Sequence, residues 1–493
     1  MKWYQGPTRT TRSEHIEDYA IRKIPSYYRW PVPAIIAVLH GNSTAMFFYT
    51  FGAQMGFYVG WPQMLWPLMY MLAGAAIVGT VLIRLASKEG LTIDLMTRGM
   101  GFGYMGSAVT SFIYGLNYVF YFLFEGTIVT HAISIYFNVH FNTLQGTVIF
   151  ALLGLVKLLF VWYGMKGLQI FQTWGVLLYA LLLGYCLFRL FQNYEIAFPR
   201  QWGAGEAQAD SLWLAFMLAN GQMVFQGLMA TDYGRFAKEE AGYRGGFLIM
   251  LGMLLPMAFT ILCGPLFAYT LLPFLHEGGG YALAVDPGYV FPTIMGIWGV
   301  LFVLITQFRI NVMNLYSGSL ALSNTFSLAF RFTPGRQFWM IIVYLIGCIV
   351  YSFNIVQYLD KWMAVTGVLT NTWIVIALTD HFICRKLLRL GPTDFIEYRR
   401  PFLYRWNPTG LTALSSGVAV GAIGIAGAYP VYFASFVAML VGMVLHLLLT
   451  AATGGKYYFT RFPHDRTTAW VPPAWYRGKR PAGSAITNSV EGE

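Results

Sequence analysis

An aromatic stripe that ends in a carboxylate is the first feature of this sequence with the makings of a chemical site. The stretch GLNYVFYFLFEG has aromatic and acidic residues at i, i+3, i+4 and i+7, so a helix would present them on one face. These residues are Tyr118, Tyr121, Phe122 and Glu125. Stacking on an aromatic ring contributes about 1–3 kcal/mol per base in nucleic-acid sites. Such a stripe more often serves packing, but a carboxylate inside an apolar run indicates a functional site.

A second group of the same kind lies about a hundred residues further on. Gln222, Phe225 and Gln226 stand at i, i+3 and i+4, again on one helix face. A glutamine amide places a donor beside an acceptor, which matches the paired groups on the edge of a pyrimidine or purine. We expect the two groups to form one site for a flat, nitrogen-containing ring.

The stretch LHGNSTA at 39–45 adds polar groups beside a glycine. Asn42 is a candidate for binding the edge of a ring. His40 titrates in the physiological range, which makes it a candidate for proton coupling; a purely structural histidine is the more common case.

Arg309 stands within an apolar run that begins at Pro292. An arginine at the centre of a membrane helix costs at least about 2.5–3.5 kcal/mol on insertion scales. We therefore expect Arg309 to face protein or a watery cavity and to have a partner there.

The composition defines the elements that must position these residues. The chain has 493 residues, of which 57% are hydrophobic and only 11% charged, with a mean hydropathy of +0.55. These values indicate a polytopic helical membrane protein embedded in a lipid bilayer. The net charge of +11 does not indicate a nucleic-acid partner, because the basic residues cluster in the two terminal segments and in the loops between apolar runs.

Apolar runs bounded by glycine, proline and charged residues predict twelve membrane spans. They are 32–55, 62–86, 105–137, 144–163, 169–191, 211–231, 246–273, 290–316, 338–356, 361–384, 409–428 and 430–452.

Basic residues are concentrated on one side of the predicted membrane, which places both termini in the cytoplasm by the positive-inside rule. Lys157, near the middle of span 144–163, is expected to reach for the membrane surface or to mark a boundary error. Glycines and polar side chains are expected to break the first span near LHGNSTA and the sixth near NGQMVFQG, at 220–227. Broken spans in corresponding positions of two halves are typical of transporter sites built on inverted repeats. Glycines that simply allow close helix packing are the alternative.

Four motifs resemble the nucleobase:cation symporter-1 family, the purine, cytosine, hydantoin and allantoin permeases. They are KEGLTIDLMTRGMGFGYMGS at 88–107, ATDYGRFAK at 230–238, NLYSGSLALSN at 314–324 and ALTDHFICRK at 377–386. The resemblance implies an all-α membrane protein of the leucine-transporter fold, with an inverted five-plus-five helix repeat and two further helices. The implied segments are an N-terminal segment 1–31, repeats at 32–191 and 211–384, a basic loop 385–408, helices at 409–452 and a largely disordered tail 453–493.

The family resemblance also implies a place for the substrate. In the family a flat heterocycle stacks between aromatics on the third and sixth spans, where Tyr118, Tyr121 and the 222–226 region fall. Gln307 falls at a substrate position on the eighth span. The usual aromatic of the sixth span is replaced by Met223, so Phe225 is expected to substitute for it.

The resemblance bears on coupling as well. Sodium-coupled members have small hydroxyl residues on the eighth span, where this chain has Arg309 and Ile310. A permanent cation there would repel sodium, so we expect no sodium site, with a proton as coupling ion and Glu125 as its leading carrier. Two roles are open for Arg309: a permanent substitute for the ion that bonds the first span, or a structural pair with Glu125 or another acid.

The sequence therefore predicts a secondary active transporter in the cell or inner membrane that imports a nucleobase such as cytosine, a purine, or a close relative. The first alternative is a carrier of a thiamine-like vitamin or an amine, held by Glu125. A channel or a membrane enzyme is less favoured, because no filter repeat and no clustered metal or nucleophile motif is found. No cofactor and no catalytic or metal-binding residue is expected.

Overall fold

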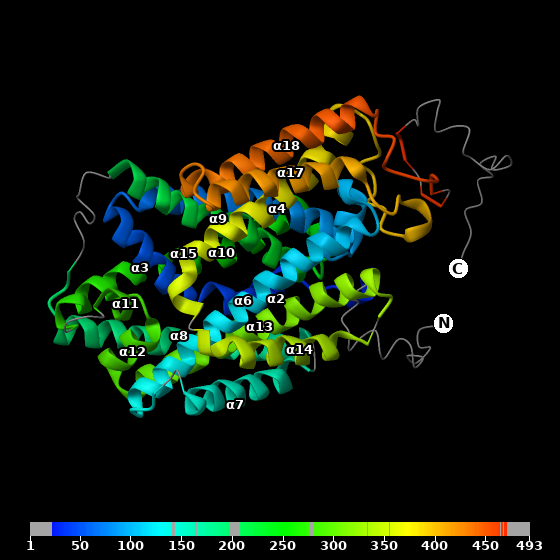
Figure 1. Ribbon diagram of the computed structural model, residues 1–493. Helices are drawn as coiled ribbons and strands as arrows, with labels where there is room; N and C mark the ends of the chain where they lie inside the picture. The colour runs from blue at the N-terminus through cyan, green and yellow to red at the C-terminus, as the bar shows by residue number, and fades with distance from the viewer. Residues whose placement is uncertain are drawn as a thin grey trace, which may run out of the picture.

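The computed structural model describes residues 22–470 except 141–142, 163–164, 198–207, 276–279, 333, 354, 464 and 467. Within these residues the chain consists of helices and turns, with one isolated β-bridge between Trp30 and Ala237. The helices form a bundle in which α17 and α18 lie along one flank and α7 and α14 along the other (Figure 1). The longer helices are α2 (Val32–Ser43), α3 (Phe47–Val59), α4 (Leu65–Glu89), α6 (Gly106–Tyr136), α7 (Leu144–Val161), α8 (Met165–Asn193), α9 (Gln208–Gly234), α10 (Gly242–Leu271), α12 (Pro287–Met295), α13 (Ile297–Ala329), α14 (Arg336–Val350), α17 (Pro408–Ile425) and α18 (Ala434–Ala452).

One further span is a composite helix that contains two π-helical stretches. It consists of α15 (Leu359–Thr366), η7 (Gly367–Asn371), α16 (Thr372–Leu378) and η8 (Thr379–Leu387). The remaining short elements are η1 (Ser26–Tyr28), α5 (Ile93–Thr97), η2 (Arg98–Phe102), η3 (Glu239–Ala241), η4 (Leu272–Phe274), α11 (Gly280–Ala284), η5 (Tyr351–Phe353), η6 (Ile355–Tyr358), η9 (Arg400–Phe402) and η10 (Val431–Phe433).

Every predicted span has a helical counterpart. Among the described residues, ten helices are long and apolar enough to cross a membrane, or eleven if α2 and α3 are counted as one bent span. The apolar helix α14 is shorter, with 15 residues. The number of crossings and the inverted repeat therefore stay predictions. The span predicted at 290–316 is wrong in its limits: Gly296, at φ 59°, separates α12 from α13, and α13 continues to Ala329.

The predicted break in the first span is confirmed. Helices α2 and α3 meet at an angle of 57° around residues 44–46. The Thr44 hydroxyl donates to the His40 carbonyl at 2.8 Å, and such bonds to the preceding turn bend helices. Backbone groups freed by the break find partners on other helices, since the Met46 amide donates to Gln307 on α13 at 3.1 Å. The break is therefore buried in protein, where irregular backbone is tolerated inside a membrane.

The predicted break in the sixth span is wrong, because α9 is helical from Gln208 to Gly234. Its two glycines instead allow close packing. A Cβ on Gly221 would lie 2.5 Å from the carbonyl oxygen of Met363, and one on Gly227 would lie 3.0 Å from the backbone nitrogen of Gly79 on α4. The polar side chains of this stretch are satisfied across helix contacts, so they do not need to unwind the helix.

Small residues also bring α3 against α10. A Cβ on Gly52 would lie 1.9 Å from the carbonyl oxygen of Ile261. Gly52→Ala should therefore force the helices apart and destabilise the protein by about 1–3 kcal/mol, the usual cost of overpacking. Thermal unfolding in detergent measures the effect. Gly184→Ala on α8 is the matched control, because nothing lies within 4 Å of the added Cβ; equal melting temperatures for the two variants would contradict this role of Gly52.

The chain segments at one end of the bundle are tied to each other. The Ile24 amide donates to the carbonyl of Gly90 at 2.8 Å, just after α4. The Trp470 indole donates to the carbonyl of Arg389 at 2.9 Å, just after η8. Both described ends of the chain therefore lie at this end, which we call the terminal face. The tail predicted to be disordered, 453–493, is described as far as Trp470, and Phe459 in this part of it is buried. Residues 471–493 lie outside the described residues.

Candidate functional site

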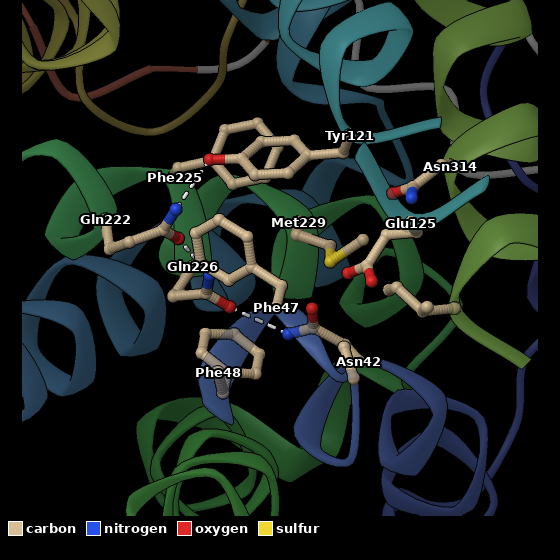
Figure 2. A pocket seen from close by; sticks show the side chains of 12 residues that line it. Asn42, Phe47, Phe48, Tyr121, Glu125, Gln222, Phe225, Gln226, Met229 and Asn314 are labelled. Atoms are coloured by element: carbon tan, nitrogen blue, oxygen red, sulfur yellow. Dashed lines mark hydrogen bonds between the residues drawn. The ribbon is translucent and has the colours of Figure 1, made fainter. Parts of the chain in front are cut away.

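A small pocket lies where the break between α2 and α3 faces α6, α9 and α13 (Figure 2). Its volume is about 10 Å³, which is the space of about one water molecule. Six residues predicted from the sequence line it: Asn42, Tyr121, Glu125, Gln222, Phe225 and Gln226. A flat heterocycle fits only if these side chains exchange their bonds to each other for bonds to the ligand.

A chain of amide and hydroxyl hydrogen bonds runs along one side of the pocket. Asn42 Nδ2 donates to Gln226 Oε1 at 2.7 Å, and Gln226 Nε2 donates to Gln222 Oε1 at 2.6 Å. Gln222 Nε2 then donates to the Tyr121 hydroxyl at 2.6 Å. The chain therefore joins the end of α2 to α9 and α6, and it presents donors and acceptors that can pair with the edge of a ring.

Aromatic rings form the other walls. The rings of Tyr121 on α6 and Phe225 on α9 face each other with centroids 4.7 Å apart and planes inclined by 37°. Phe47, the first residue of α3, packs edge-on against Tyr121 at 5.3 Å. Met223 instead lies against Gly74 of α4, so Phe225 is the aromatic of this helix that faces Tyr121. Phe225 thus lies where the expected substitution requires it, and its role toward a substrate stays a prediction.

Glu125 lies on the side of the pocket formed by α6 and α13, across from Gln222 and Gln226 (Figure 2). Its carboxylate accepts a hydrogen bond from Gln307 Nε2 and one from the backbone of Phe47. Gln307 Oε1 also accepts from the Met46 amide at 3.1 Å. The carboxylate is thus held at the amino end of α3, where helix backbone dipoles favour negative charge, and Gln307 connects it to the helix break.

Lys157 on α7 supplies the positive charge that interacts with Glu125. Lys157 is only 1% exposed. The expectation that Lys157 extends to the membrane surface or marks a boundary error is therefore wrong. A buried charge is costly without an opposite charge nearby, and Glu125 is the acid whose charge acts on Lys157. No ion pair joins the two side chains among the described residues, so this is an interaction between separated charges. It adds an electrostatic role to the roles toward substrate and proton that the sequence predicts for Glu125.

Arg309 does not pair with Glu125. Its Nη1 donates to the Thr44 hydroxyl at 2.9 Å, and its Nε donates to Gln172 Oε1 of α8 at 2.9 Å. No ion pair among the described residues joins Arg309 to an acid. The guanidinium therefore connects α13 to the α2–α3 break and to α8, as expected of a residue that holds the first span. Its partner in the first span is the Thr44 hydroxyl and not a backbone carbonyl, and its partner on α8 is the Gln172 side-chain amide.

Four other predicted residues lie outside the pocket lining. Tyr118 packs against Phe225 at 5.4 Å, and its hydroxyl lies 2.7 Å from that of Tyr114. Phe122 points away toward Phe150 of α7. His40 is half-buried and bonds the backbone of Gly252 on α10. Gln307 does not line the pocket itself but donates a hydrogen bond to Glu125, which does.

Six lining residues were not predicted: Ala45, Phe47, Phe48, Met229, Ile310 and Asn314. Phe47 and Phe48 directly follow the break, so helical periodicity gives no information about the direction of their side chains. Asn314 opens the motif NLYSGSLALSN, and one turn of helix separates it from Ile310. That spacing would have placed Asn314 on the same helix face as Ile310. Gln172, the partner of Arg309, had no signal in the sequence.

Sequence comparisons identify no relative. No protein-family model matches the chain, and no curated protein sequence matches it.

Structure comparisons do find similar folds, and the proteins that have them are membrane transporters. The first is Mhp1, a nucleobase-cation-symport-1 family transporter, in a closed conformation with bromovinylhydantoin bound; it is 15% identical, covers 90% of this chain and 96% of its own, and has a TM-score of 0.67. The inward-facing conformation of Mhp1 is 13% identical, with 90% and 97% coverage and a TM-score of 0.64. A substrate-bound, outward-open Na⁺-coupled sialic acid symporter is 11% identical, with 90% and 92% coverage and a TM-score of 0.59.

The chain therefore has the fold of these transporters over nine-tenths of its length. The expected fold class is confirmed, and the similarity to Mhp1 supports the resemblance that the four sequence motifs carry. At these levels of sequence identity the comparison shows the fold alone, so the identity of the ligand must be inferred from the residues of the site.

Proposed function

We propose that this protein is a secondary active transporter of the nucleobase:cation symporter-1 family that imports a small nitrogen heterocycle. The observation that carries the proposal is the pairing of two facing rings, Tyr121 and Phe225, with a chain of amides at a buried helix break. A nucleobase or a close relative would lie between the rings, which are in contact at 4.7 Å and would have to move apart. It would exchange the bonds between Asn42, Gln222 and Gln226 for bonds to its own edge.

Alternating access requires two groups of helices that move relative to each other. The contacts favour such a division: α3, α4, α9 and α10 pack extensively among themselves, and α6, α7, α13 and α14 do the same. The pocket lies between the two groups. A rocking motion of one group against the other would open the pocket to one side of the membrane at a time.

Proton coupling without sodium is the second part of the proposal. Arg309 puts a permanent positive charge between the helix break and α13, which disfavours a second cation there by direct repulsion. Glu125 is the proton carrier in this proposal, because it lines the pocket and is bonded through Gln307 to the helix break. Protonation would then change both the charge beside the substrate and the contact that fixes α3. His40 is the second candidate.

A cationic substrate is the alternative, and the exposure of the Glu125 carboxylate to the pocket favours it. In that case the acid would neutralise a thiamine-like vitamin or an amine between the aromatic rings, which also attract cations. The basic terminal face would lie in the cytoplasm in either case, in the cell or inner membrane.

Thermal stabilisation of the purified protein by nucleobases, ureides, vitamins and amines, with and without sodium, tests the proposal. A ligand at a hundred times its dissociation constant stabilises the folded state by about 2.7 kcal/mol. We expect a neutral heterocycle to raise the melting temperature equally in sodium and choline buffers. Stabilisation by cations alone would replace the nucleobase assignment with the alternative, and a requirement for sodium would contradict the role given to Arg309.

A further inference from the structure

A second pocket, which shares no lining residue with the first, lies at the terminal face. Its volume is about 380 Å³, and it lies where α6 begins, where α13 ends, and beside the segment around η9. Three arginines line it: Arg331 two residues after α13, Arg400 in η9, and Arg405 before α17. The lining contains no aspartate or glutamate, so its charge is positive.

These arginines have no acidic partner among the described residues. The nearby acids are bound elsewhere, because Arg399 holds both Glu397 and Asp465, each at 2.7 Å. The guanidinium groups that line the pocket therefore keep their donors for a ligand. Arginine presents its donors in a planar fork that matches phosphate oxygens.

A helix terminus adds to the same preference. Met105, at the amino end of the 31-residue helix α6, lies in the wall of the pocket. The amino end of a helix carries a partial positive charge that favours anions. The hydroxyls of Ser327 and Thr460 also line the pocket, but they donate to the carbonyls of Asn324 and Pro401. The pocket thus combines fixed charge with a helix terminus.

The surroundings indicate where the phosphate comes from. Exposed aromatic residues stand beside the arginines in the chain: Phe330 is 69% exposed, Phe332 45% and Trp406 44%. Aromatic side chains of this kind are enriched at the level of lipid headgroups. The ends of two spans, α6 and α13, also form the pocket, so it would lie at the edge of the bilayer.

We propose that this pocket binds the phosphate of an anionic phospholipid headgroup, with Arg331, Arg400 and Arg405 as its ligands. Basic pockets between spans at a cytoplasmic surface favour anionic headgroups. The lipid would join the end of α13, on one side of the transport pocket, to the loop that precedes α17. This assignment concerns a different site and stands independently of the transported substrate.

Native mass spectrometry of the full chain in detergent tests the proposal, with short-chain phosphatidylglycerol, short-chain phosphatidylcholine and pyrophosphate as probes. The test variant is Arg400→Gln/Arg405→Gln. The matched control is Lys238→Gln/Arg244→Gln, which changes the net charge equally at exposed positions of the same face. Wild type and control should bind phosphatidylglycerol in preference to phosphatidylcholine, and the test variant should bind it about tenfold more weakly or worse.

Arg331→Asn provides a second variant on a different element, should the double variant fail to fold. Arg331 has φ 55°, and asparagine tolerates this backbone conformation. The variant should also weaken phosphatidylglycerol binding. Equal binding by variants and control, or no preference for the anionic lipid in the wild type, would overturn the proposal. Binding of pyrophosphate without binding of phosphatidylglycerol would assign the pocket to a soluble phosphate and overturn the lipid assignment.

Discussion

Glu125→Gln is expected to abolish accumulation of substrate driven by a pH gradient while leaving substrate exchange intact. The glutamine has the same shape and can still accept the bond from Gln307, but it cannot release a proton. One pH unit is worth about 1.36 kcal/mol per proton, which corresponds to a tenfold concentration ratio across the membrane. The variant should lose that ratio completely. Uptake and counterflow in proteoliposomes measure the two activities separately.

The interaction of Glu125 with Lys157 demands a control, because the substitution also removes the negative charge that acts on this buried lysine. Glu125→Gln/Lys157→Met removes both charges. If Glu125 serves only to neutralise Lys157, this double variant should recover accumulation. If the carboxyl group carries the proton, it stays uncoupled. Accumulation by the single variant at the wild-type level would contradict the coupling role outright.

Gln226→Leu is expected to weaken heterocycle binding by about 100-fold or more. Gln226 is the central member of the amide chain, since it accepts from Asn42 and donates to Gln222. Leucine fills a similar volume without either bond. In the complex, the ring edge would lose both the donor and the acceptor of the Gln226 amide, and each buried polar group left without a partner costs about 1–3 kcal/mol. Isothermal titration or scintillation proximity binding with the heterocycle found in the ligand panel measures the loss.

Asn220→Leu is the matched control for this variant. Asn220 is a buried amide on the same helix, with bonds to Tyr70 and Ser435 at 2.7 Å each, and it does not line the pocket. It should lower the melting temperature and leave the affinity of the folded protein within about twofold. If Asn220→Leu weakened binding as much as Gln226→Leu, the loss would come from general damage to α9, and the amide chain would not be the binding edge.

Much of the site was predictable because it lies on regular helices. The spacing of Tyr121 and Glu125, and that of Gln222, Phe225 and Gln226, fixes one face of α6 and one face of α9 once the helical period is accepted. Apolar length and punctuation likewise place the spans. The four motifs carry the resemblance, and the fold of the structure agrees with it.

The errors and omissions have a common physical origin in contacts between distant segments. Whether a glycine breaks a helix or lets a neighbour approach depends on that neighbour, as Gly221 and Met363 show. The partners of Arg309 lie on other helices, and sequence spacing holds no information about them. Phe47 escapes prediction because the break in front of it resets the helical period. The inverted repeat and the number of crossings stay predictions.

Uptake by wild-type proteoliposomes under separately imposed gradients is the measurement that tests proton-coupled heterocycle transport most directly. The vesicles would be prepared with the best-stabilising heterocycle outside and either a proton gradient or a sodium gradient directed inward. We expect accumulation under the proton gradient in sodium-free buffer, and loss of that accumulation when a protonophore is added. Accumulation under the sodium gradient alone, or no accumulation of any heterocycle under either gradient, would contradict the proposed function.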